Sequence, residues 1–561
     1  MKKFLLNKFS LNRYAFLLSL IFLLLIIVIY FFNQGYYIGR NPYPSGDEPD
    51  YLVGALQLKE YGGPSKFISY LISGSFTEVR KHPLYMFLLS FFADKSLDFF
   101  VYAKFFNFIL GGVLLITSYF IMRRMFNTFA AVFFVLILSL SELFLTETAL
   151  IVPDNLMTLL ILLSCYFYYL GFKTKNILQV KYWALGSFFC GIAYLTKPNG
   201  IFLLGAFCLT ALLLLRKRIL KSKAFYLSVM TFLLVASPLL IRNFVLYKNP
   251  FYNNNVSLLW IENRQERRSP DFDEAPPTLI TYFAEKGVIN EVRLYAENFI
   301  KMASNFSMLI LFGEWQWRFS FSLLVLTVLS MVLDRDRKRS LFFEIFFIGS
   351  YLFFAYNYKV SPHYRHIMPI MFIPVGFVSL LFDRVPFVSP KRRLYIYRVA
   401  VVLLALIGLG LGYKKVYAEK RLSTKVFQGQ VDVSEAHVRT RNWLLSNMKD
   451  TEVYVMGLDD NFMFTWYTDI KGKRIIQPYF DSFGGFTSFL IENRVDYVVL
   501  GGQTVNSFPE IYQNYFEKKK NSPDYLRRIS NPDKWVLVFN FPFENEEHFK
   551  VLIYDVRALW R

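Results

Sequence analysis

Cysteine and histidine are scarce in this chain, with 3 Cys and 5 His among 561 residues. The cysteines, Cys165, Cys190 and Cys208, all fall within apolar stretches and lack the close pairing of zinc sites. The sequence therefore excludes a disulfide scaffold and predicts thiols in the core or facing lipid. His363 and His366 straddle a predicted junction between a loop and a helix, which does not favour a metal site. A divalent ion could be required, but no residue pattern supports one.

Charge is also scarce and unevenly distributed. Only 19% of the residues are charged, whereas 54% are hydrophobic and 62 are phenylalanine, a composition that predicts an integral membrane protein. Acidic residues number 42 against 63 Lys and Arg, which gives a net charge of +21. From Val416 onward the two signs balance at 19 each, so the excess lies in the apolar part. This distribution argues against a nucleic-acid partner and fits cytoplasmic loops beside membrane lipids of negative charge.

Glycine-rich phosphate loops, internal repeats and low-complexity segments are absent from the sequence. The chain thus lacks the P-loop and dinucleotide motifs through which many enzymes bind nucleotides. What it has instead is a series of apolar runs, most of them near the ~20 residues needed to cross a bilayer. We expect about eleven spans, at residues 14–32, 99–121, 129–146, 155–171, 182–196, 201–215, 224–241, 317–333, 341–357, 367–382 and 396–412.

Loop charge orients these spans, because Lys and Arg mark the cytoplasmic side. Basic clusters such as Arg123-Arg124 fall on one side at every second loop, and the alternation holds through all eleven crossings. We expect residues 1–415 to form the transmembrane domain of a multi-pass protein of the plasma membrane, with outer loops at about 33–98 and 245–315. The first run is too long for a signal peptide and no small-residue cleavage motif follows it, so we expect an uncleaved span.

Residues 416–561 are predicted to form an extracytoplasmic α/β domain. Asp432 and Glu435 can cap an amphipathic helix that contains Trp443 and Leu444. Four later stretches favour strands, at residues 452–456, 495–500, 535–541 and 551–556.

Polar residues of the membrane part gather on the predicted outer face. The densest group is Gly46-Asp47-Glu48-Pro49-Asp50-Tyr51, which places three carboxylates within four positions just outside the first span. Charged groups so close to a membrane are costly and usually functional. Separate loops and span ends bring the other candidates to the same side. The full set of candidates is Asp47, Glu48, Lys81, His82, Asp154, Lys197, Arg242, His363, Tyr364 and Arg365.

A site at the headgroup plane suits a substrate with a lipid tail in the bilayer and a polar head outside. A carboxylate there can accept a proton from an incoming hydroxyl group. Lysine and arginine can hold a phosphate, and arginine can do so with two parallel hydrogen bonds.

Structural roles remain open for the same residues. Asp47 and Glu48 could lie in a solvated loop or at a helix N-terminus, because Pro49 suits a first helical turn and the helix dipole favours acids there. Asp50 is predicted to be a simple helix-start charge. Asp154 follows Pro153 and could simply begin a helix. Lys81 and Lys197 could be interfacial anchors. Glu142 and Glu147 are expected to be outer-loop charges without a catalytic role.

Several motifs together resemble the GT-C glycosyltransferases that use polyprenyl-phosphate sugars, a family that includes protein O-mannosyltransferases and lipid A aminoarabinose transferases. The resemblance covers about residues 1–415. The proline after Glu48 departs from many members, which carry a small residue there. The matching stretches are Gly46-Asp47-Glu48, Lys81-His82-Pro83-Leu84-Tyr85, Pro153-Asp154, Leu195-Thr196-Lys197-Pro198, Pro238 to Pro250, and His363-Tyr364-Arg365-His366 through Pro369.

The resemblance implies an inverting transferase that moves a sugar from a polyprenyl-phosphate donor to an acceptor hydroxyl on the outer face. It implies Asp47 as general base with Glu48 in support, and Asp154 as a second acid near the acceptor. The candidates for the donor phosphate are Lys81, Lys197, Arg242, Tyr364 and Arg365, with His82 and His363 as further candidates. The sequence predicts lipid-linked sugar and membrane lipids as partners, and it identifies neither the sugar nor the acceptor.

Two other function classes stay open at this point. A transporter or flippase for a lipid-linked sugar would usually show inverted repeats and charges at the bilayer midplane, and the sequence shows neither. An outer-surface assembly or receptor protein, with residues 416–561 as its binding module, would leave Asp47, Lys81 and Arg365 unexplained.

Overall fold

The computed structural model describes most of the chain. The described residues are 2–40, 47–78, 80–94, 97–261, 278–308, 316–359, 364–384, 435–456, 471–476, 483–500, 534–540 and 552–561. Gly46, His363, the predicted span at 396–412 and the predicted domain boundary near residue 415 lie outside them, so the predictions made there stay predictions.

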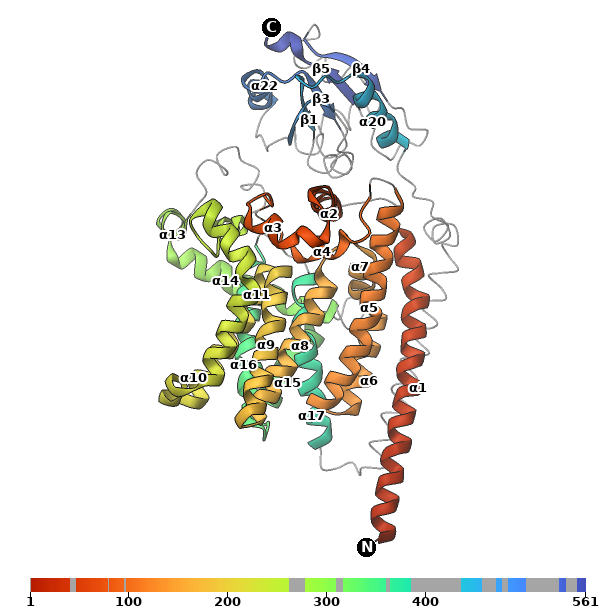
Figure 1. The fold of residues 1–561 in the computed structure, drawn as a ribbon, viewed down its shortest axis with the longest axis vertical. Coiled ribbons are helices and arrows are strands. Elements are labelled where there is room, and N and C mark those ends of the chain that lie inside the picture. The colour runs from red at the N-terminus through yellow and green to blue at the C-terminus, as the bar shows by residue number, and fades with distance from the viewer. Residues whose placement is uncertain are drawn as a thin grey trace.

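Long apolar helices form a bundle whose axes run roughly parallel (Figure 1). Within the described part of the chain, five helices are long and apolar enough to cross a membrane, and a bent pair would make a sixth. The predicted total of eleven spans therefore remains untested. The helices of the bundle are α1 (Lys2–Arg40), α5 (Leu97–Met125), α6 (Thr128–Leu140), α7 (Glu142–Ala149), α8 (Asp154–Lys173), α9 (Asn176–Thr196), α10 (Ile201–Leu215), α11 (Lys223–Tyr247), α15 (Gln316–Val332), α16 (Arg337–Asn357) and α17 (Phe372–Arg384).

Small residues let three of these helices approach closely. The Ser164 hydroxyl of α8 donates to the carbonyl of Gly186 in α9 at 2.7 Å, and the Ser228 hydroxyl of α11 donates to the carbonyl of Trp183 at 3.1 Å. Hydrogen bonds between helices at small-residue contacts are a common means of association in membranes, where apolar burial alone gives little drive. These bonds hold α8 against α9 and α9 against α11, and α8 and α9 carry two of the candidate site residues at their ends.

The predicted third span is not one continuous helix. Its two parts, α6 and α7, meet at a bend of 64°. Ser141 lies at the break with extended backbone (φ −67°, ψ 119°), and its hydroxyl accepts a hydrogen bond from the amide of Phe144. A serine that caps a following helix ends the preceding one, because its backbone leaves the helical region. The prediction of a single helix over 129–146 is therefore wrong in this detail.

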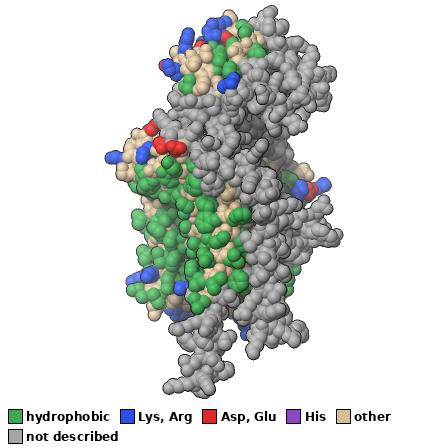
Figure 2. Space-filling view, turned by 90° about the vertical axis from the view of Figure 1, so that its right-hand side faces the viewer, with side chains coloured by type: hydrophobic (Ala, Val, Ile, Leu, Met, Phe, Trp, Pro, Cys, Tyr) green, Lys and Arg blue, Asp and Glu red, His purple; other side chains and the backbone are tan. Residues whose placement is uncertain are grey.

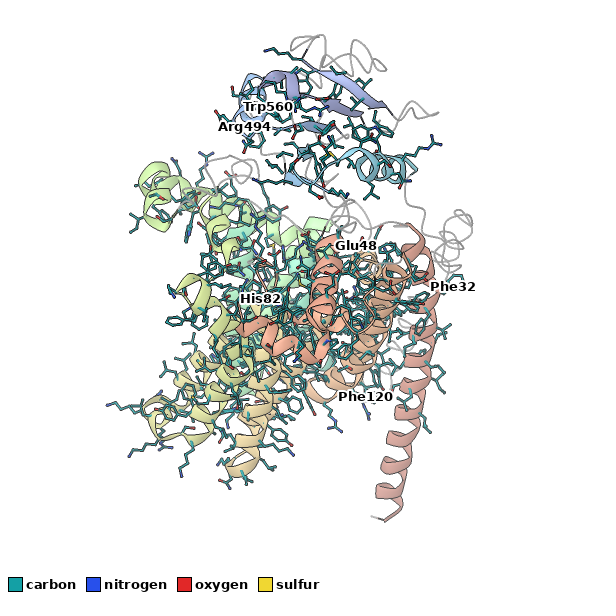
Figure 3. The ribbon with its side chains drawn as sticks, turned by 45° about the horizontal axis from the view of Figure 1, so that its top comes forward. Phe32, Glu48, His82, Phe120, Arg494 and Trp560 are labelled. Atoms are coloured by element: carbon teal, nitrogen blue, oxygen red, sulfur yellow. The ribbon has the colours of Figure 1, made fainter. Side chains whose placement is uncertain are left out.

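A layer of short helices covers one end of the bundle. It contains α2 (Glu48–Tyr61), α3 (Phe67–Ile72) and α4 (Leu84–Leu89). The six residues of α4 are too few to cross a bilayer, as expected for this stretch. Figure 3 shows Glu48 and His82 within this layer.

Two amphipathic helices, α13 (Leu279–Lys286) and α14 (Val288–Met308), flank the same end of the bundle (Figure 1). The buried Lys359 ammonium, just beyond α16, links both helices to the bundle. It donates hydrogen bonds to Glu291 Oε1 at 2.8 Å and to the Tyr282 hydroxyl at 2.9 Å. Lys359 precedes the short 3-10 turns η6 (Tyr364–His366) and η7 (Met368–Ile370), which lead into α17.

The C-terminal part is a small α/β unit beyond the layer of short helices (Figure 1). Its strands are β1 (Val453–Met456), β2 (Lys473–Ile476), β3 (Tyr497–Leu500), β4 (Val536–Asn540) and β5 (Leu552–Asp555). They form one sheet in the order β2-β1-β3-β5-β4. The β2, β1 and β3 strands are parallel, whereas β5 is antiparallel to both β3 and β4.

Two helices pack with this sheet, α20 (Glu435–Asn447) and α22 (Phe483–Glu492). The core contains Val455, Phe486 and Trp535. The predicted fold class, a polytopic helical membrane protein with a C-terminal α/β unit, is confirmed. The β2 strand was not predicted, because its four residues include Lys473 and Arg474 and carry little apolar signal.

Candidate active site

Asp47 lies at the centre of an ion-pair cluster that three distant segments build. It directly precedes the first residue of α2, and its side chain makes no hydrogen bond to the end of this helix. Its Oδ2 accepts a hydrogen bond from Arg365 Nη2 of η6 at 2.8 Å, and its Oδ1 lies 3.5 Å from Lys81 Nζ. Lys81 also pairs with Asp50, which was expected to be only a helix-start charge. Asp47 keeps 35% of its side chain exposed, so it remains accessible to solvent.

Charge in this cluster controls the pKa of Asp47. Burial raises this pKa, but Lys81 and Arg365 more than offset the burial, so the pKa lies well below its ordinary value. The carboxylate is therefore ionised at neutral pH. Asp50 differs, because burial raises its pKa despite its contact with Lys81.

Asp154 and Lys197 form the second half of the site. Lys197 Nζ donates to Asp154 Oδ1 at 2.6 Å, with 19% and 3% of the side chains exposed. Asp154 is the first residue of α8, and Lys197 follows the last residue of α9. The packing of these two helices thus brings the pair together. The other oxygen, Asp154 Oδ2, is buried and has no hydrogen-bond partner among the described residues.

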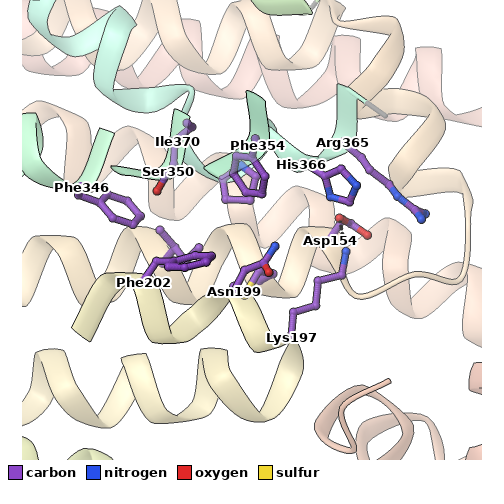
Figure 4. A pocket seen from close by; sticks show the side chains of 13 residues that line it. Asp154, Lys197, Asn199, Phe202, Phe346, Ser350, Phe354, Arg365, His366 and Ile370 are labelled. Carbon is purple, nitrogen blue, oxygen red and sulfur yellow. Dashed lines mark hydrogen bonds and ion pairs between the residues drawn. The ribbon is translucent and has the colours of Figure 1, made fainter. Parts of the chain in front are cut away.

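Arg365 of the first half and the pair of Asp154 and Lys197 of the second half line one pocket (Figure 4). Its polar end carries Asp154, Lys197 and Arg365, together with Asn199 and His366. Its other end is mostly apolar, with Ser350 as a polar exception, and is lined by Met157, Ile161, Phe202, Phe346, Phe354 and Ile370. Arg365 Nε is buried near the polar end without a hydrogen-bond partner in the described structure. A buried donor without a partner is rare in proteins and indicates a place for a ligand group or water.

Glu48 does not face this pocket. Its side chain is fully buried, and Oε1 accepts from the amide of Ile151 at 2.8 Å. The same oxygen lies 3.6 Å from Nζ of Lys104, which is also fully buried. Both contacts serve the fold around Asp47. Lys104 was absent from the predicted site, although a lysine inside an otherwise apolar span is itself a signal of a role.

Glu147 belongs to the site more closely than the sequence indicated. It is 7% exposed at the end of α7, and its Oε2 has no hydrogen-bond partner in the described structure. Its electrostatic neighbours include Asp154, Arg365 and Lys197. The expectation of a simple outer-loop charge failed because the bend at Ser141 turns α7 inward toward η6, which no local pattern reveals.

Arg242 is placed differently from its predicted role at the donor phosphate. Its Nε donates to the carbonyl of Phe76 at 2.9 Å and its Nη2 to the carbonyl of Glu78 at 2.5 Å. Its Nη1 donates to Asn243 Oδ1 at 2.7 Å. Arg242 therefore holds the segment that leads to Lys81 rather than presenting its donors to the pocket.

His82 is likewise a structural contact. Its Nδ1 lies within hydrogen-bond distance of the carbonyl of Tyr194, so Nδ1 donates, and its Nε2 accepts from Asn253 Nδ2 at 3.3 Å. Burial lowers the pKa of His82 to about 4, so the imidazole is neutral. The ring connects the loop of Lys81 to the end of α9, which carries Lys197.

The structure thus brings together five of the predicted residues: Asp47, Lys81, Asp154, Lys197 and Arg365. The side chain of Tyr364 and the whole of His363 lie outside the described residues. No group of three or more His, Cys, Asp or Glu side chains suited to a metal ion occurs in the described part of the chain.

Comparison with known proteins supports the same family. Residues 81–241 match the family model described as dolichyl-phosphate-mannose-protein mannosyltransferase, a range that includes Lys81, Asp154 and Lys197. No curated protein matches the chain.

Among solved structures, the oligosaccharyltransferase of Archaeoglobus fulgidus in complex with zinc and sulfate is 12% identical, with a TM-score of 0.50, over 85% of this chain and 67% of its own. ArnT from Cupriavidus metallidurans bound to undecaprenyl phosphate is 13% identical, with a TM-score of 0.47, over 97% of this chain and 98% of its own. The resemblance predicted from the motifs is confirmed: this is a multi-pass membrane protein with the fold of the GT-C glycosyltransferases, and its residues 81–241 match the mannosyltransferase family.

Proposed function

We propose that the chain is an inverting glycosyltransferase that moves a sugar from a polyprenyl monophosphate to an acceptor hydroxyl at the outer face of the membrane. The observation that carries this proposal is the pocket whose polar end holds Asp154, Lys197 and Arg365, because Arg365 also pairs with Asp47 at the edge of this pocket. Its apolar end suits the first units of a lipid chain. The mannosyltransferase match adds a sugar on a polyprenyl phosphate as the donor class.

In this mechanism Asp47 removes the proton of the acceptor hydroxyl. The oxygen attacks the anomeric carbon from the side opposite the phosphate, the bond from carbon to phosphate oxygen breaks, and the phosphate leaves as an anion. Arg365 and Lys197 stabilise the charge that develops on the phosphate. A single displacement inverts the anomeric centre and needs no covalent intermediate between sugar and enzyme.

The ion pair between Asp47 and Arg365 implies that the donor binds before Asp47 acts as a base. Without donor, Arg365 and Lys81 hold the pKa of Asp47 low, which makes this carboxylate a weak base. A phosphate bound by Arg365 supplies negative charge near the guanidinium and weakens its pull on Asp47. The pKa of Asp47 then rises, so donor binding prepares the base for the acceptor. Glu48 acts only by positioning Asp47.

The direct test is Asp47→Asn in proteoliposomes, with dolichyl-phosphate mannose as the first donor and extracted source membranes as acceptor. We expect transfer to fall by about 100- to 10,000-fold, the usual share of a general base. Asp98→Asn, at an exposed acid in the first turn of α5, is the matched control and should transfer normally. Normal transfer by Asp47→Asn would contradict the mechanism, because the general base would then lie elsewhere.

The same assay separates a transferase from a transporter. A transferase releases free polyprenyl phosphate in step with sugar transfer, whereas a flippase moves the intact lipid-linked sugar and releases none. Release that requires Asp47 would favour the transferase, and translocation without release would favour the transporter.

A further inference from the structure

A buried ion pair lies behind the proposed base. Lys104, in α5, and Glu48, next to Asp47, are both 0% exposed, and Lys104 Nζ lies 3.6 Å from Glu48 Oε1. Neither side chain lines the pocket. Burying two charges is costly, and such a pair is a poor means of gaining stability. Its position one residue from Asp47 instead points to a role in geometry.

Polar groups of Glu48, Lys104 and Asn107 bind the main chain of four successive residues, 149–152, shortly before Asp154. Lys104 Nζ donates to the carbonyl of Ala149 at 2.9 Å. The amide of Ile151 donates to Glu48 Oε1 at 2.8 Å. Asn107, one turn after Lys104 on α5, donates to the carbonyls of Leu150 and Val152, the latter at 3.1 Å. Residues 149–152 are thus held at successive main-chain groups, directly before Pro153 and Asp154.

The network also reaches the segment of Lys81. Asn107 Oδ1 accepts a hydrogen bond from the Tyr85 hydroxyl of α4 at 2.9 Å. Tyr85 packs edge-on against Tyr51 of α2, with ring centroids 5.2 Å apart. Lys81 Nζ lies over the ring of Tyr51, 5.0 Å from its centroid. One face of α5 therefore contacts all three segments that carry Asp47, Lys81 and Asp154.

We propose that Lys104 is a positioning residue that fixes the base segment and the Asp154 segment relative to each other. This inference rests on the proposed function of Asp47 and Asp154. Lys104 does so through two bonds at once, one to Glu48 and one to Ala149. Because a misplacement of about 1 Å at a reacting group can cost roughly 100-fold in rate, the loss of this bridge lowers turnover without removing any group that touches the substrate.

The test compares Lys104→Met with a buried ion pair at the other end of the bundle. Met keeps the length of the lysine stem and removes the charge. The control is Arg339→Met, because Arg339 pairs with Asp334 through Nε at 2.8 Å and Nη2 at 2.7 Å and is 9% exposed. Both variants remove the positive charge that faces a buried carboxylate, so both lose stability by a similar mechanism. Only Lys104→Met removes the bridge between Glu48 and Ala149.

Two readouts separate positioning from stability, both on detergent-purified folded protein. In transfer from dolichyl-phosphate mannose, Lys104→Met should lose about 10- to 100-fold in kcat with donor KM changed by less than about threefold, whereas Arg339→Met should keep kcat. In hydrogen–deuterium exchange, residues 48–52 and 149–155 should exchange faster in Lys104→Met than in wild type. In Arg339→Met their exchange should equal that of wild type.

Wild-type kcat per folded molecule in Lys104→Met would overturn the inference, and so would unchanged exchange of both segments. A similar loss of kcat in Arg339→Met would also overturn it, because general destabilisation would then explain both. Failure of the proposed function looks different: wild type would transfer no sugar, or Asp47→Asn would transfer normally. In that case the hydrogen–deuterium exchange still tests whether Lys104 holds residues 48–52 and 149–155 in place.

Discussion

Arg365 is the side chain at which the two halves of the site meet. Its Nη2 donates to Asp47, while its Nε is buried near the pocket without a partner in the described structure. The guanidinium is a planar fork with five donors, so it can bind a carboxylate and a phosphate at the same time. A lysine at this position would supply the charge, but it lacks the planar fork that lets arginine bind a carboxylate and a phosphate at once.

Arg365→Lys should therefore weaken donor binding by about 10- to 100-fold, the range expected when a charged hydrogen bond is lost. Binding of undecaprenyl phosphate to the purified variant, measured by native mass spectrometry, checks this prediction. The conservative Lys197→Arg variant serves as a comparison, because it keeps both charge and donors. Equal affinity of wild type and Arg365→Lys would remove Arg365 from the phosphate site.

The same residue governs a pH dependence. Asp47 has a pKa below its ordinary value, so its charged form stabilises the fold above its unfolded pKa of ~4, and this contribution is lost as the pH falls through the lower folded value. Without Arg365 the folded pKa of Asp47 rises, and the acid limb of kcat/KM should move to higher pH in Arg365→Ala. A pH–rate profile measures the shift, and an unchanged acid limb would show that Arg365 does not control Asp47.

His82 gives a stability prediction of its own. Burial lowers its pKa from 6.5 to about 4, so its neutral form stabilises the fold fully above the unfolded value. This contribution is lost as the pH falls through the window between the two values, by ~2 kcal/mol at about pH 5. His82→Gln does not titrate, so its Tm should fall less than that of wild type between pH 7 and about pH 5. A parallel fall in both proteins would contradict the assigned state of His82.

The sequence predicted the residues of the site better than their contacts. The sequence predicts Asp47, Lys81, Asp154, Lys197 and Arg365 because each is a charge in a loop or at a span end on the predicted outer side, where charge is costly. The same rule selected Arg242, but it cannot tell a donor aimed at a ligand from one bonded to the carbonyls of Phe76 and Glu78. Such pairings depend on segments far apart in sequence.

At the scale of elements, the turn between α9 and α10 decides where Lys197 points. Gly200 ends the 3-10 turn η2 (Pro198–Gly200), and a Cβ atom there would lie 2.4 Å from the Tyr194 nitrogen and 2.7 Å from the Ala193 carbonyl carbon. These are backbone atoms of α9, which cannot move aside like a flexible side chain. Glycine at this position lets the turn pack directly on the helix end.

Gly200→Ala should therefore displace the turn and cost about 100-fold in transfer, because Lys197 moves away from Asp154. Gly205→Ala, on α10 with nothing within 4 Å of the added atom, is the matched control and should keep full activity. It should even gain roughly 0.5–1 kcal/mol of helix stability. Full transfer by Gly200→Ala would show that the turn tolerates the shift.

Elements were predicted well where one local signal decided them. The expected span at 201–215 coincides with α10, since an apolar run there lies between Gly200 and a basic cluster. The break in the third span was missed, because Ser141 ends α6 only through the cap that it gives α7. The paired strands β4 and β5 were expected from their apolar runs, whereas the basic edge strand β2 was not.

At the scale of the whole molecule, the charged side chains are concentrated at the two ends of the helix bundle. In Figure 2 a hydrophobic belt separates two polar ends, and Lys and Arg side chains are visible at both of them. The exposed turn between α8 and α9 carries Lys175 at the end away from the α/β unit (Figure 1), and η3 carries Arg216 to Lys221. We infer that this end is cytoplasmic, because short loops rich in Lys and Arg are retained inside. The site and the α/β unit then face outward, where a donor must arrive on a lipid.

Cysteine labelling in intact cells tests this orientation with little background, because Cys165 and Cys190 are buried and Cys208 is half-buried. A membrane-impermeant maleimide should label Arg561→Cys, at an exposed position after β5, in intact cells. It should label Lys175→Cys only after the membrane is opened, because that exposed position lies in the turn between α8 and α9. The reverse pattern would place the site on the cytoplasmic side, where nucleotide-activated sugars are available and a lipid-linked donor would no longer be required.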